Sequence, residues 1–446
     1  MSLPPNWDAV RDEVVSILQD LLRLDTTNPP GHEIIAAEYV AARMREVGVE
    51  PVVLESEPGR GSVVGRWHGT GEAAPLLLMS HTDVVPAEAA AWSRGPFSGD
   101  LADGYLWGRG ALDMKCITAA HLTILRLLAR QGLRLRRDVV QMATADEEVG
   151  GVKGAGWLVR HHPDLIRAEY ALNEGGGNEF PFGATRFYSV QTAEKGLARF
   201  RMRVRGEPGH GSVPRQDNAV TRLAAAVARL GSTPLPLHRT RTVEAMFESI
   251  GQAVPGLAEA SDALWDEATS SQTLGKLPVP DSFRRMLAAM VRNTATPTVL
   301  QAGTKINVIP SLAEALVDGR TLPGFAAQDF LAEVRPIVGD DVELELLDDA
   351  PALEADLDSP LYSAIVDVMR DELPDARPSP TLVTGATDAK HVVHLGTRVY
   401  GFGPLRYEAA TEGEALVHAH NERISVDNLL FMTRVLYNVV TRFGLT

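Results

Sequence analysis

Short apolar runs alternate with helical patterns through about the first 190 residues, and this alternation most constrains the fold. The largely apolar runs are Leu76–Met79, Val139–Ala145 and Tyr170–Leu172, and each ends in a polar or glycine-rich turn. Between the first two runs, Ala119–Ala129 repeats apolar residues at helical spacing. Strands that are apolar along their length are buried on both faces, as in a parallel sheet covered by helices. The sequence therefore predicts an α/β unit with a mostly parallel sheet.

Side chains that can bind metal ions gather just after these runs. They are His81, Glu147, Glu148 and Glu174, and Asp113 in Gly108–Lys115 is a further candidate. Asp83 comes two residues after His81, where a carboxylate can hold the second ring nitrogen of a metal-binding imidazole. Because ligands bind beyond the carboxyl ends of the strands in such sheets, we expect these side chains to lie close together.

Each of these residues also has an ordinary structural interpretation. His81 could be a hydrogen-bonded residue at a strand end, and Asp113 a turn residue or helix cap. Glu147 and Glu148 could be solvated acids in a loop, and Glu174 a solvated turn residue. With one histidine of Val417–His420, however, the set has two imidazoles and three carboxylates. That is too many for one tetrahedral zinc ion and suits two metal ions that share a bridging carboxylate. No thiolate is needed, and Cys116 is the only cysteine.

The composition changes near Glu194, where a second domain is predicted to begin. Leu197–Arg205 alternates apolar and basic residues, which is typical of a strand with one solvated face, and we interpret the basic residues as that face. The following elements are a helix over Asn218–Leu230 with Asp217 as its cap, strands over Thr298–Gln301 and Leu312–Arg320, a helix over Ala326–Ile337 and a strand over Val342–Leu346. This β-α-β-β-α-β order predicts a ferredoxin-like α+β unit.

The second domain is predicted to interrupt the first. Helical patterns over about residues 234–296 indicate a packed insertion within the ferredoxin-like unit. After about residue 351 the α/β character returns, with helices over Leu361–Met369 and Leu429–Val439 and a strand over Val399–Phe402. We therefore predict one domain over residues 1–192 and 353–446, and an inserted domain over residues 193–352.

Charge and hydropathy limit the function. The net charge of −15 argues against a general nucleic-acid binder. Acidic and basic residues interrupt the N-terminal apolar pattern, which predicts an amphipathic helix and not an export signal. We find no apolar stretch long enough to span a bilayer, and a single cysteine suits a reducing compartment. We expect a soluble, cytoplasmic protein.

Five segments resemble successive motifs of one enzyme family. They are Ser80–Pro86, Gly108–Lys115, Ala145–Gly151, Leu172–Gly176 and Gly209–Pro214. The family is the dizinc family of aminoacylase, acetylornithine deacetylase, succinyl-diaminopimelate desuccinylase and glutamate carboxypeptidase. The resemblance extends from Thr26–Gly31 to His418–Glu422, and the insertion together with Ala302–Pro310 is most similar to the branch of carboxypeptidase S and N-acyl-amino-acid hydrolases. It implies a zinc-peptidase-like catalytic domain with an inserted lid or dimerisation domain.

The resemblance also implies roles for the metal-binding residues. One zinc ion would be bound by His81, Glu174 and Asp113, and the other by Glu148, a C-terminal histidine and the same Asp113. The family pattern places His418, and not His420, in the last ligand position. The implied cofactor is two Zn²⁺ per subunit, although Co²⁺ or Mn²⁺ would suit the same ligands.

The remaining implied roles are catalytic or concern the substrate. Glu147 would be the general base for a zinc-activated water, and Asp83 would orient His81. His210 would hydrogen-bond the substrate carbonyl or oxyanion, in related dimers across the subunit interface. Asn307 and Arg320 resemble the family's contacts to a substrate carboxylate.

Two residues depart from the family pattern. Cys116 stands where relatives commonly have glycine, and we interpret it as a small buried residue and not as a thiolate ligand. Lys390 stands where relatives often have arginine. Lysine lacks the planar fork through which arginine pairs with a carboxylate.

The implied activity is hydrolysis of an amide bond next to a free carboxylate, with N-acyl amino acids as the first choice of substrate. A metallo-carboxypeptidase or dipeptidase is the alternative. A catalytically silent relative that only binds ligands is a third interpretation, and the presence of Glu147 with every expected ligand argues against it.

Overall fold

The computed structural model describes residues 4–182, 185–253, 262–277, 279–408 and 413–446. Its contacts divide the chain into two compact units. The first comprises Met1–Thr192, Ala355–Thr381 and Thr387–Thr446, and the second comprises Ala193–Glu354 and Leu382–Ala386. Residues 382–386 thus pack with the second unit, although we expected them in the first domain. There the Lys195 N–H donates a hydrogen bond to the Val383 carbonyl at 2.9 Å.

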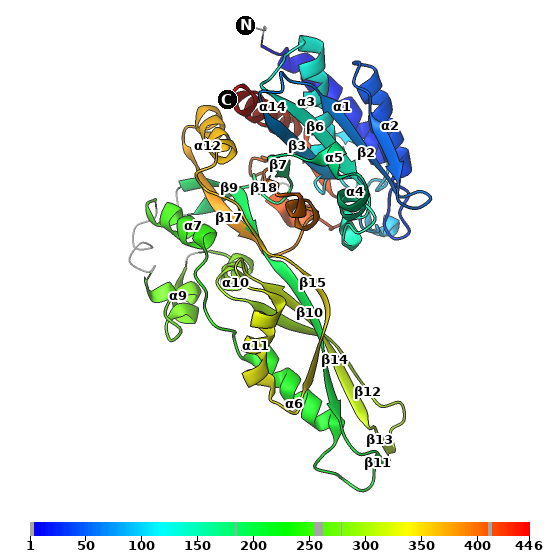
Figure 1. Ribbon diagram of the computed structural model, residues 1–446, viewed down its shortest axis with the longest axis vertical. Helices are drawn as coiled ribbons and strands as arrows, with labels where there is room; N and C mark the ends of the chain where they lie inside the picture. The colour runs from blue at the N-terminus through cyan, green and yellow to red at the C-terminus, as the bar shows by residue number, and fades with distance from the viewer. Residues whose placement is uncertain (1–3, 183–184, 254–261, 278, 409–412) are drawn as a thin grey trace. The chain divides into compact units, whose positions relative to one another are not determined.

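The first unit contains a mixed sheet with parallel strands at its centre (Figure 1). Its strand order is β1 (Val52–Glu55), β2 (Gly61–Trp67), β6 (Arg137–Thr144), β3 (Ala73–His81), β7 (Tyr170–Asn173), β18 (Arg398–Gly401) and β9 (Thr185–Glu194), with β8 (Glu179–Phe182) and β17 (Ala376–Val383) beside β9. The pairs β6–β3, β3–β7 and β7–β18 are parallel. The prediction of an α/β fold with a largely parallel sheet is confirmed. A small separate sheet joins β4 (Asp100–Ala102), β5 (Tyr105–Trp107) and β19 (Arg423–Ser425).

Helices cover both faces of this sheet. One face packs against α1 (Trp7–Arg23), α2 (Ile34–Arg45), α3 (Lys115–Gln131), α12 (Pro360–Glu372) and α14 (Val426–Leu445), and the other against α4 (Ala155–His161), α5 (Pro163–Ile166) and α13 (Ala389–Val392). Leu76 and Leu78 of β3 point into the first core, whereas Leu77 and Met79 point into the second. Full burial of each side chain contributes about 1.5–3 kcal/mol, which explains why this strand is apolar on both sides. The helices α1 and α14, at the two ends of the chain, pack against each other (Figure 1).

The parallel strands bring the predicted site residues to one edge of the sheet. His81, the last residue of β3, pairs with Thr144, the last residue of β6. Glu147 begins the short 3-10 helix η2 (Glu147–Val149) that follows β6, and Glu174 follows β7 directly. Because these strands run in the same direction, their carboxyl ends carry these side chains into one region.

The second unit contains a four-stranded sheet with two helices on one face. The strand order is β12 (Thr294–Ala302), β14 (Leu312–Thr321), β10 (Gly196–Arg205) and β15 (Glu343–Ala350), and the helices are α6 (Ala219–Ser232) and α11 (Ala327–Val338). The chain order β10-α6-β12-β14-α11-β15 matches the predicted ferredoxin-like order. Short strands β11 (Gly209–His210) and β13 (Val308–Ile309) form a separate pair, and β16 (Leu353–Glu354) pairs with β9. The predicted insertion contributes α7 (Arg241–Gly251), α9 (Ser270–Lys276) and α10 (Asp281–Met290).

Two details of this unit test the sequence interpretation. The basic residues of β10 do form one face, where Arg201 and Arg203 pair with Glu314, Glu343 and Glu345 on the neighbouring strands. The predicted cap of α6 is wrong, because Asn218 and not Asp217 accepts the Val220 N–H, at 2.9 Å. Asp217 instead pairs with Arg215.

None of the helices in the described residues is long and apolar enough to cross a membrane.

Candidate metal centre

His81 presents one ring nitrogen to two carboxylates. Its Nε2 lies 3.1 Å from Asp113 Oδ1 and 3.6 Å from Glu174 Oε2. Its Nδ1 lies 3.0 Å from the backbone carbonyl of Asp83 and 3.5 Å from the Asp83 carboxylate. An imidazole whose Nδ1–H donates to that carbonyl presents the lone pair of Nε2 to Asp113 and Glu174. The Asp83 backbone thus contacts His81 more closely than the side chain to which we assigned that role.

Asp113 faces a different imidazole with each carboxylate oxygen. Whereas Oδ1 lies beside His81, Oδ2 lies 3.1 Å from Nε2 of His418. The same nitrogen of His418 is 3.2 Å from Glu148 Oε1. The structure therefore brings together all five predicted ligands in two groups, His81–Asp113–Glu174 and Asp113–Glu148–His418, and within each group the ligand atoms lie within 4.8 Å of one another. His420 is exposed and belongs to neither group.

The carboxylates of this cluster raise the pKa of both of its histidines. The Asp113 and Glu148 carboxylates raise the pKa of His418 to about 10. Burial lowers the pKa of His81, but the Glu174 and Asp113 carboxylates outweigh this effect and raise it well above its ordinary value. Burial raises the pKa of Glu174 to about 7. The carboxylates thus favour positive charge at both imidazole positions. A set of nitrogen and oxygen donors around one shared carboxylate fits two divalent ions.

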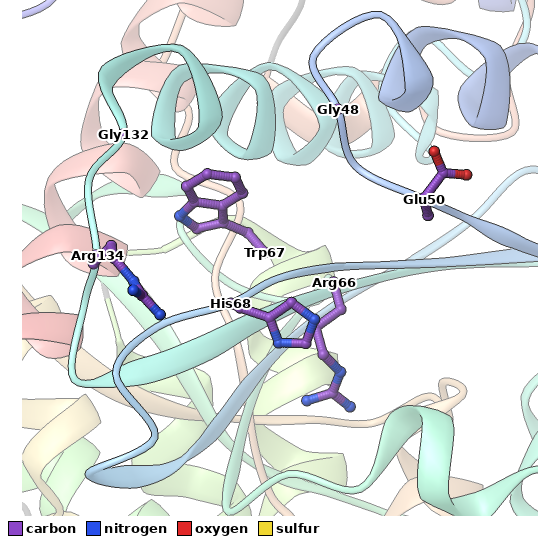
Figure 2. A pocket seen from close by; sticks show the side chains of 7 residues that line it. All are labelled: Gly48, Glu50, Arg66, Trp67, His68, Gly132 and Arg134. Carbon is purple, nitrogen blue, oxygen red and sulfur yellow. The ribbon is translucent and has the colours of Figure 1, made fainter.

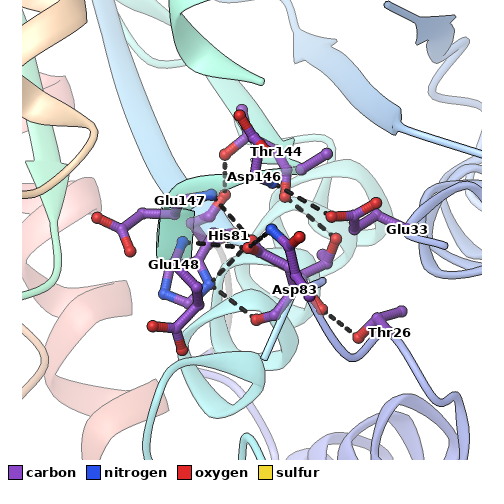
Figure 3. Close-up of polar contacts among 12 residues, drawn as sticks. Thr26, Glu33, His81, Asp83, Thr144, Asp146, Glu147 and Glu148 are labelled. Carbon is purple, nitrogen blue, oxygen red and sulfur yellow. Dashed lines mark hydrogen bonds and ion pairs between the residues drawn. The ribbon is translucent and has the colours of Figure 1, made fainter. Parts of the chain in front are cut away.

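Glu147 lies in the turn that follows β6, and its side chain is half-buried. Burial, together with the Glu174 carboxylate, raises the pKa of Glu147 well above its ordinary value. The Asp83 carboxylate accepts the backbone N–H of Glu147 on Oδ1 and that of Glu148 on Oδ2, both at 3.1 Å (Figure 3). Asp83 therefore orients the peptide groups of the predicted base and of the neighbouring ligand.

A buried ion pair joins the Asp113 loop to the His418 segment. The Glu422 carboxylate accepts hydrogen bonds from the N–H groups of Gly110, Leu112 and Asp113 at 2.7–3.1 Å, and from the Arg109 guanidinium at 2.8 Å. Arg109 also donates to the carbonyls of His418 and Ala419. The pair thus holds two predicted ligands that are far apart in the sequence. We did not predict these roles, although Arg109 lies in the motif Gly108–Lys115 and Glu422 in the motif His418–Glu422.

The other predicted site residues lie in the second unit. His210 is exposed, and its Nδ1 lies 2.7 Å from Ser212 Oγ. Asn307 is close to it, because the Asn307 carbonyl accepts the Gly211 N–H at 2.9 Å. Arg320 forms a two-bond ion pair with Asp318, at 2.7 and 3.2 Å.

Arg320 lies near the carboxyl end of β14, whereas Asn307 precedes the amino end of this strand. Thr294 of β12 pairs with Arg320, whereas Ala302, shortly before Asn307, pairs with Ala313. Seven residues of strand span roughly 23 Å. One protomer therefore does not bring both side chains to a single carboxylate.

The two residues that depart from the family pattern are both buried. Cys116 is fully enclosed and contacts the Leu112 carbonyl at 3.3 Å. Burial raises the pKa of its thiol far above the ordinary value, which disfavours a thiolate ligand. Lys390 lies in α13 with 6% of its surface exposed, and its positive charge lowers the pKa of Glu147 against the effect of burial.

A separate cavity of about 470 Å³ lies beside the carboxyl end of β2 (Figure 2). It is lined by Gly48, Glu50, Arg66, Trp67, His68, Gly132 and Arg134. Arg66 pairs with Asp138 at 3.0 Å, and Trp67 donates to the Leu133 carbonyl at 2.8 Å. The cavity contributes no residue to either ligand group.

Comparison with known proteins identifies relatives along most of the chain. Residues 77–442 match the model of peptidase family M20/M25/M40. A probable carboxypeptidase S-like 2 of Dictyostelium discoideum is 29% identical over 85% of this chain and 74% of that protein. The N-fatty-acyl-amino acid synthase/hydrolase PM20D1 of Bos taurus is 30% identical over 85% of this chain and 77% of its own length. Aminoacylase-1 of Sus scrofa is 27% identical over 92% of this chain and 90% of that protein.

Solved structures show the same fold. The M20 family metallo-carboxypeptidase Sso-CP2 of Sulfolobus solfataricus has a TM-score of 0.73 at 18% identity, and the match covers 98% of this chain and 100% of the other. Human carnosine dipeptidase 1 has a TM-score of 0.66 at 15% identity, with 99% and 98% coverage. The family match and these likenesses agree with the site geometry. The chain belongs to peptidase family M20/M25/M40, a family of metal-dependent hydrolases of amide bonds.

Proposed function

We propose that this protein hydrolyses the amide bond of N-acyl amino acids or related substrates with a free carboxylate, and that Glu147 is its general base. The observation that carries the proposal is the position of Asp113, whose two oxygens each lie 3.1 Å from a different imidazole. A carboxylate in that position can bridge two metal ions. The proposed ligands are His81, Asp113 and Glu174 for one ion, and Asp113, Glu148 and His418 for the other.

We propose zinc as the metal, with cobalt or manganese as alternatives for the same donors. When bound, a pair of divalent ions would polarise the substrate carbonyl and make water more acidic. The chain supplies the proton transfers. Glu147 takes the proton of the attacking water and passes it to the leaving nitrogen as the C–N bond breaks. The products are a carboxylic acid and an amine, so no further reactant is required.

The substrate carboxylate would be recognised by residues of the second unit. Arg320 has the planar fork that pairs with a carboxylate through two bonds, and Asp318 now occupies that fork. His210 and Asn307 lie together, away from Arg320, which supports their action at the site of another copy of the chain. A homodimer is also supported by the exposed apolar residues of β12 and its neighbourhood, which include Val299, Leu300, Ile306 and Val308.

The choice of acyl amino acids is supported by relatives named as N-fatty-acyl-amino acid hydrolases and aminoacylase-1. The carboxypeptidase S-like relative and the metallo-carboxypeptidase structure favour the alternative of peptide cleavage. Both substrate classes have an amide bond near a free carboxylate. The cluster chemistry supports either one.

The test combines metal analysis with the variant Glu147→Gln. We expect about two metal ions per chain in both proteins, and a loss of turnover of at least about 100-fold in the variant, because glutamine cannot accept the proton. Asp83→Asn is unsuitable as a control, since it alters the hydrogen bonds of the turn. Glu72→Gln is suitable, because Glu72 is an exposed partner of Arg136. Full turnover in Glu147→Gln would refute the proposed role.

A panel of N-acyl amino acids and dipeptides, including amides that lack the free carboxylate, would define the substrate class. We expect turnover of acyl amino acids and little turnover of their carboxamides. Faster turnover of dipeptides would favour the peptidase alternative. Equal turnover of carboxylates and carboxamides would contradict the proposed recognition.

A further inference from the structure

The turn that carries Glu147 begins with an unusual backbone conformation. Asp146 has a φ of 77°, in the left-handed region that side chains with a Cβ rarely adopt. This residue is buried, and its carbonyl accepts the N–H groups of Val149 and Gly151. Its Oδ2 accepts the Lys153 N–H at 2.8 Å. Such a conformation persists only where surrounding contacts hold it in place.

Arg60 provides a charged contact to Asp146. Its guanidinium donates to Asp146 Oδ1 at 2.7 Å, to Glu33 Oε1 at 2.8 Å and to the Pro30 carbonyl at 3.1 Å. The Asp146 N–H also points to Glu33 Oε1, at 3.3 Å. The three ionisable side chains are buried, with 6% of Arg60 and 3% or less of Glu33 and Asp146 exposed.

The chain leaves room for this guanidinium with a glycine. Gly31 has a φ of +85°, and a Cβ added there would lie 2.5 Å from Cζ of Arg60. The Arg60 head group is therefore confined by the backbone of the Pro30–Gly31 turn on one side and by two carboxylates on the other. This confinement fixes the place where Asp146 can make its ion pair.

Asp83 holds the other side of the same turn. Its carboxylate accepts the N–H groups of Glu147 and Glu148, and Asn28 donates to its Oδ2 at 2.9 Å. Figure 3 shows Glu33, Asp146 and Asp83 around the segment from which Glu147 and Glu148 project. The peptide that precedes Glu147 and the peptide groups that follow it are thus held by separate anchors.

We propose that Arg60 is a positioning residue for Glu147, acting through the Glu33–Arg60–Asp146 network to hold the turn that aims this base. The inference rests on the proposed function of Glu147. Arginine suits the task because its planar fork binds two carboxylates and a carbonyl at once, whereas the ammonium of lysine is a point charge. Without the guanidinium, Glu33 and Asp146 lose their shared cation, and Asp146 loses a contact that holds its left-handed conformation.

The experiment compares Arg60→Met and Arg60→Lys with the matched control Arg66→Met. Arg66 belongs to β2, which begins directly after Arg60, and it also pairs with a partly buried carboxylate, Asp138, at 3.0 Å. All variants are made in the full chain, loaded with zinc, and measured for metal content, thermal unfolding, kcat and KM. Glu147→Gln is measured in parallel on the same substrates.

We expect kcat to fall by about 100-fold in Arg60→Met and about 10-fold in Arg60→Lys, because small displacements of a catalytic group have effects of this size. KM should stay within about threefold and metal content should match wild type. Arg66→Met should keep its kcat even if it unfolds at a lower temperature. Where Arg60→Met does not fold, the lysine variant decides.

A folded, zinc-loaded Arg60→Lys with wild-type kcat would overturn the inference, as would a loss confined to KM or to metal content. These results differ from a failure of the proposed function. In that case Glu147→Gln itself would turn over substrate at the wild-type rate.

Discussion

Replacement of Glu422 by glutamine tests how strongly the chain supports its candidate metal centre. The Glu422 side chain is fully buried, and its two oxygens accept four hydrogen bonds. Leu112 and Asp113 donate to Oε1, while Gly110 and Arg109 donate to Oε2. A carboxamide has one oxygen, so in either orientation two of the four donors face an N–H group instead of an acceptor.

The magnitude follows from those two lost contacts. Hydrogen bonds to a charged group contribute about 1.5–3 kcal/mol each, and breaking a buried ion pair costs about 3–5 kcal/mol. We therefore expect Glu422→Gln to lower the free energy of unfolding by about 3–5 kcal/mol. Because the loop of Asp113 and the segment of His418 both lose a support, metal affinity should also fall by about 10- to 100-fold.

The assay is urea unfolding of the metal-free and zinc-loaded proteins, together with calorimetric titration of zinc. The control is Glu72→Gln, whose side chain is exposed beside Arg136; exposed ion pairs contribute little, so its midpoint should match wild type. An unchanged urea midpoint and zinc affinity in Glu422→Gln would refute the reasoning that this carboxylate holds the two segments together.

Three further predictions concern stability and assembly. Burial lowers the pKa of His121 to about 3, and neither ring nitrogen has a hydrogen-bond partner among the described residues. Below its ordinary pKa of 6.5 the unfolded chain binds a proton that the folded chain does not, so stability falls from pH 6.5 towards pH 3. As the pH falls from 7 to 5, the free energy of unfolding of His121→Leu should therefore rise by about 2 kcal/mol relative to that of wild type. Urea unfolding at both pH values measures this difference, and a difference that does not change with pH would contradict the prediction. Gly154→Ala should unfold at a much lower temperature than wild type, because the added Cβ would lie 1.7 Å from the Ala145 carbonyl. The control Gly231→Ala meets nothing within 4 Å and should stabilise its helix slightly. Equal melting temperatures of the two variants would contradict the steric argument. Leu300→Asp, at a residue that is 56% exposed on β12, should shift the protein from dimer to monomer in light scattering, and a monomeric wild type would contradict the proposed homodimer.

Local sequence patterns were sufficient to predict the two kinds of sheet and to expect several candidate site residues close together. The apolar run that ends at His81 is buried on both faces, and the residues after β6 and β7 lie at the same edge because the strands are parallel. A rule about strand ends is enough to group His81, Glu147 and Glu174. His418 required the family resemblance, because nothing in its own surroundings relates it to Asp113.

The residues that support the site were not predicted. Arg60 and Asp146 are 86 positions apart, and Arg109 and Glu422 are 313 apart. Pairings over such separations depend on the folded path of the chain, whereas periodicity reports only on near neighbours. The wrong cap of α6 concerns two adjacent residues that are both good caps: Asn218 accepts the Val220 N–H, while Asp217 pairs with Arg215.

The first unit is assembled from segments far apart in the sequence, and this affects when the enzyme can become active during its synthesis. β18 pairs with β7, and α14 packs against α1 and α3, so the early part of the chain lacks a sheet neighbour and a covering helix until the segment from β18 to α14 has been made. His418 arrives with that same segment. Contacts of such long sequence separation form slowly. A growing chain therefore exposes an acidic, incomplete cluster, and the proposed two-metal site, with its hydrolytic activity, is complete only after the segment that carries His418 has been made.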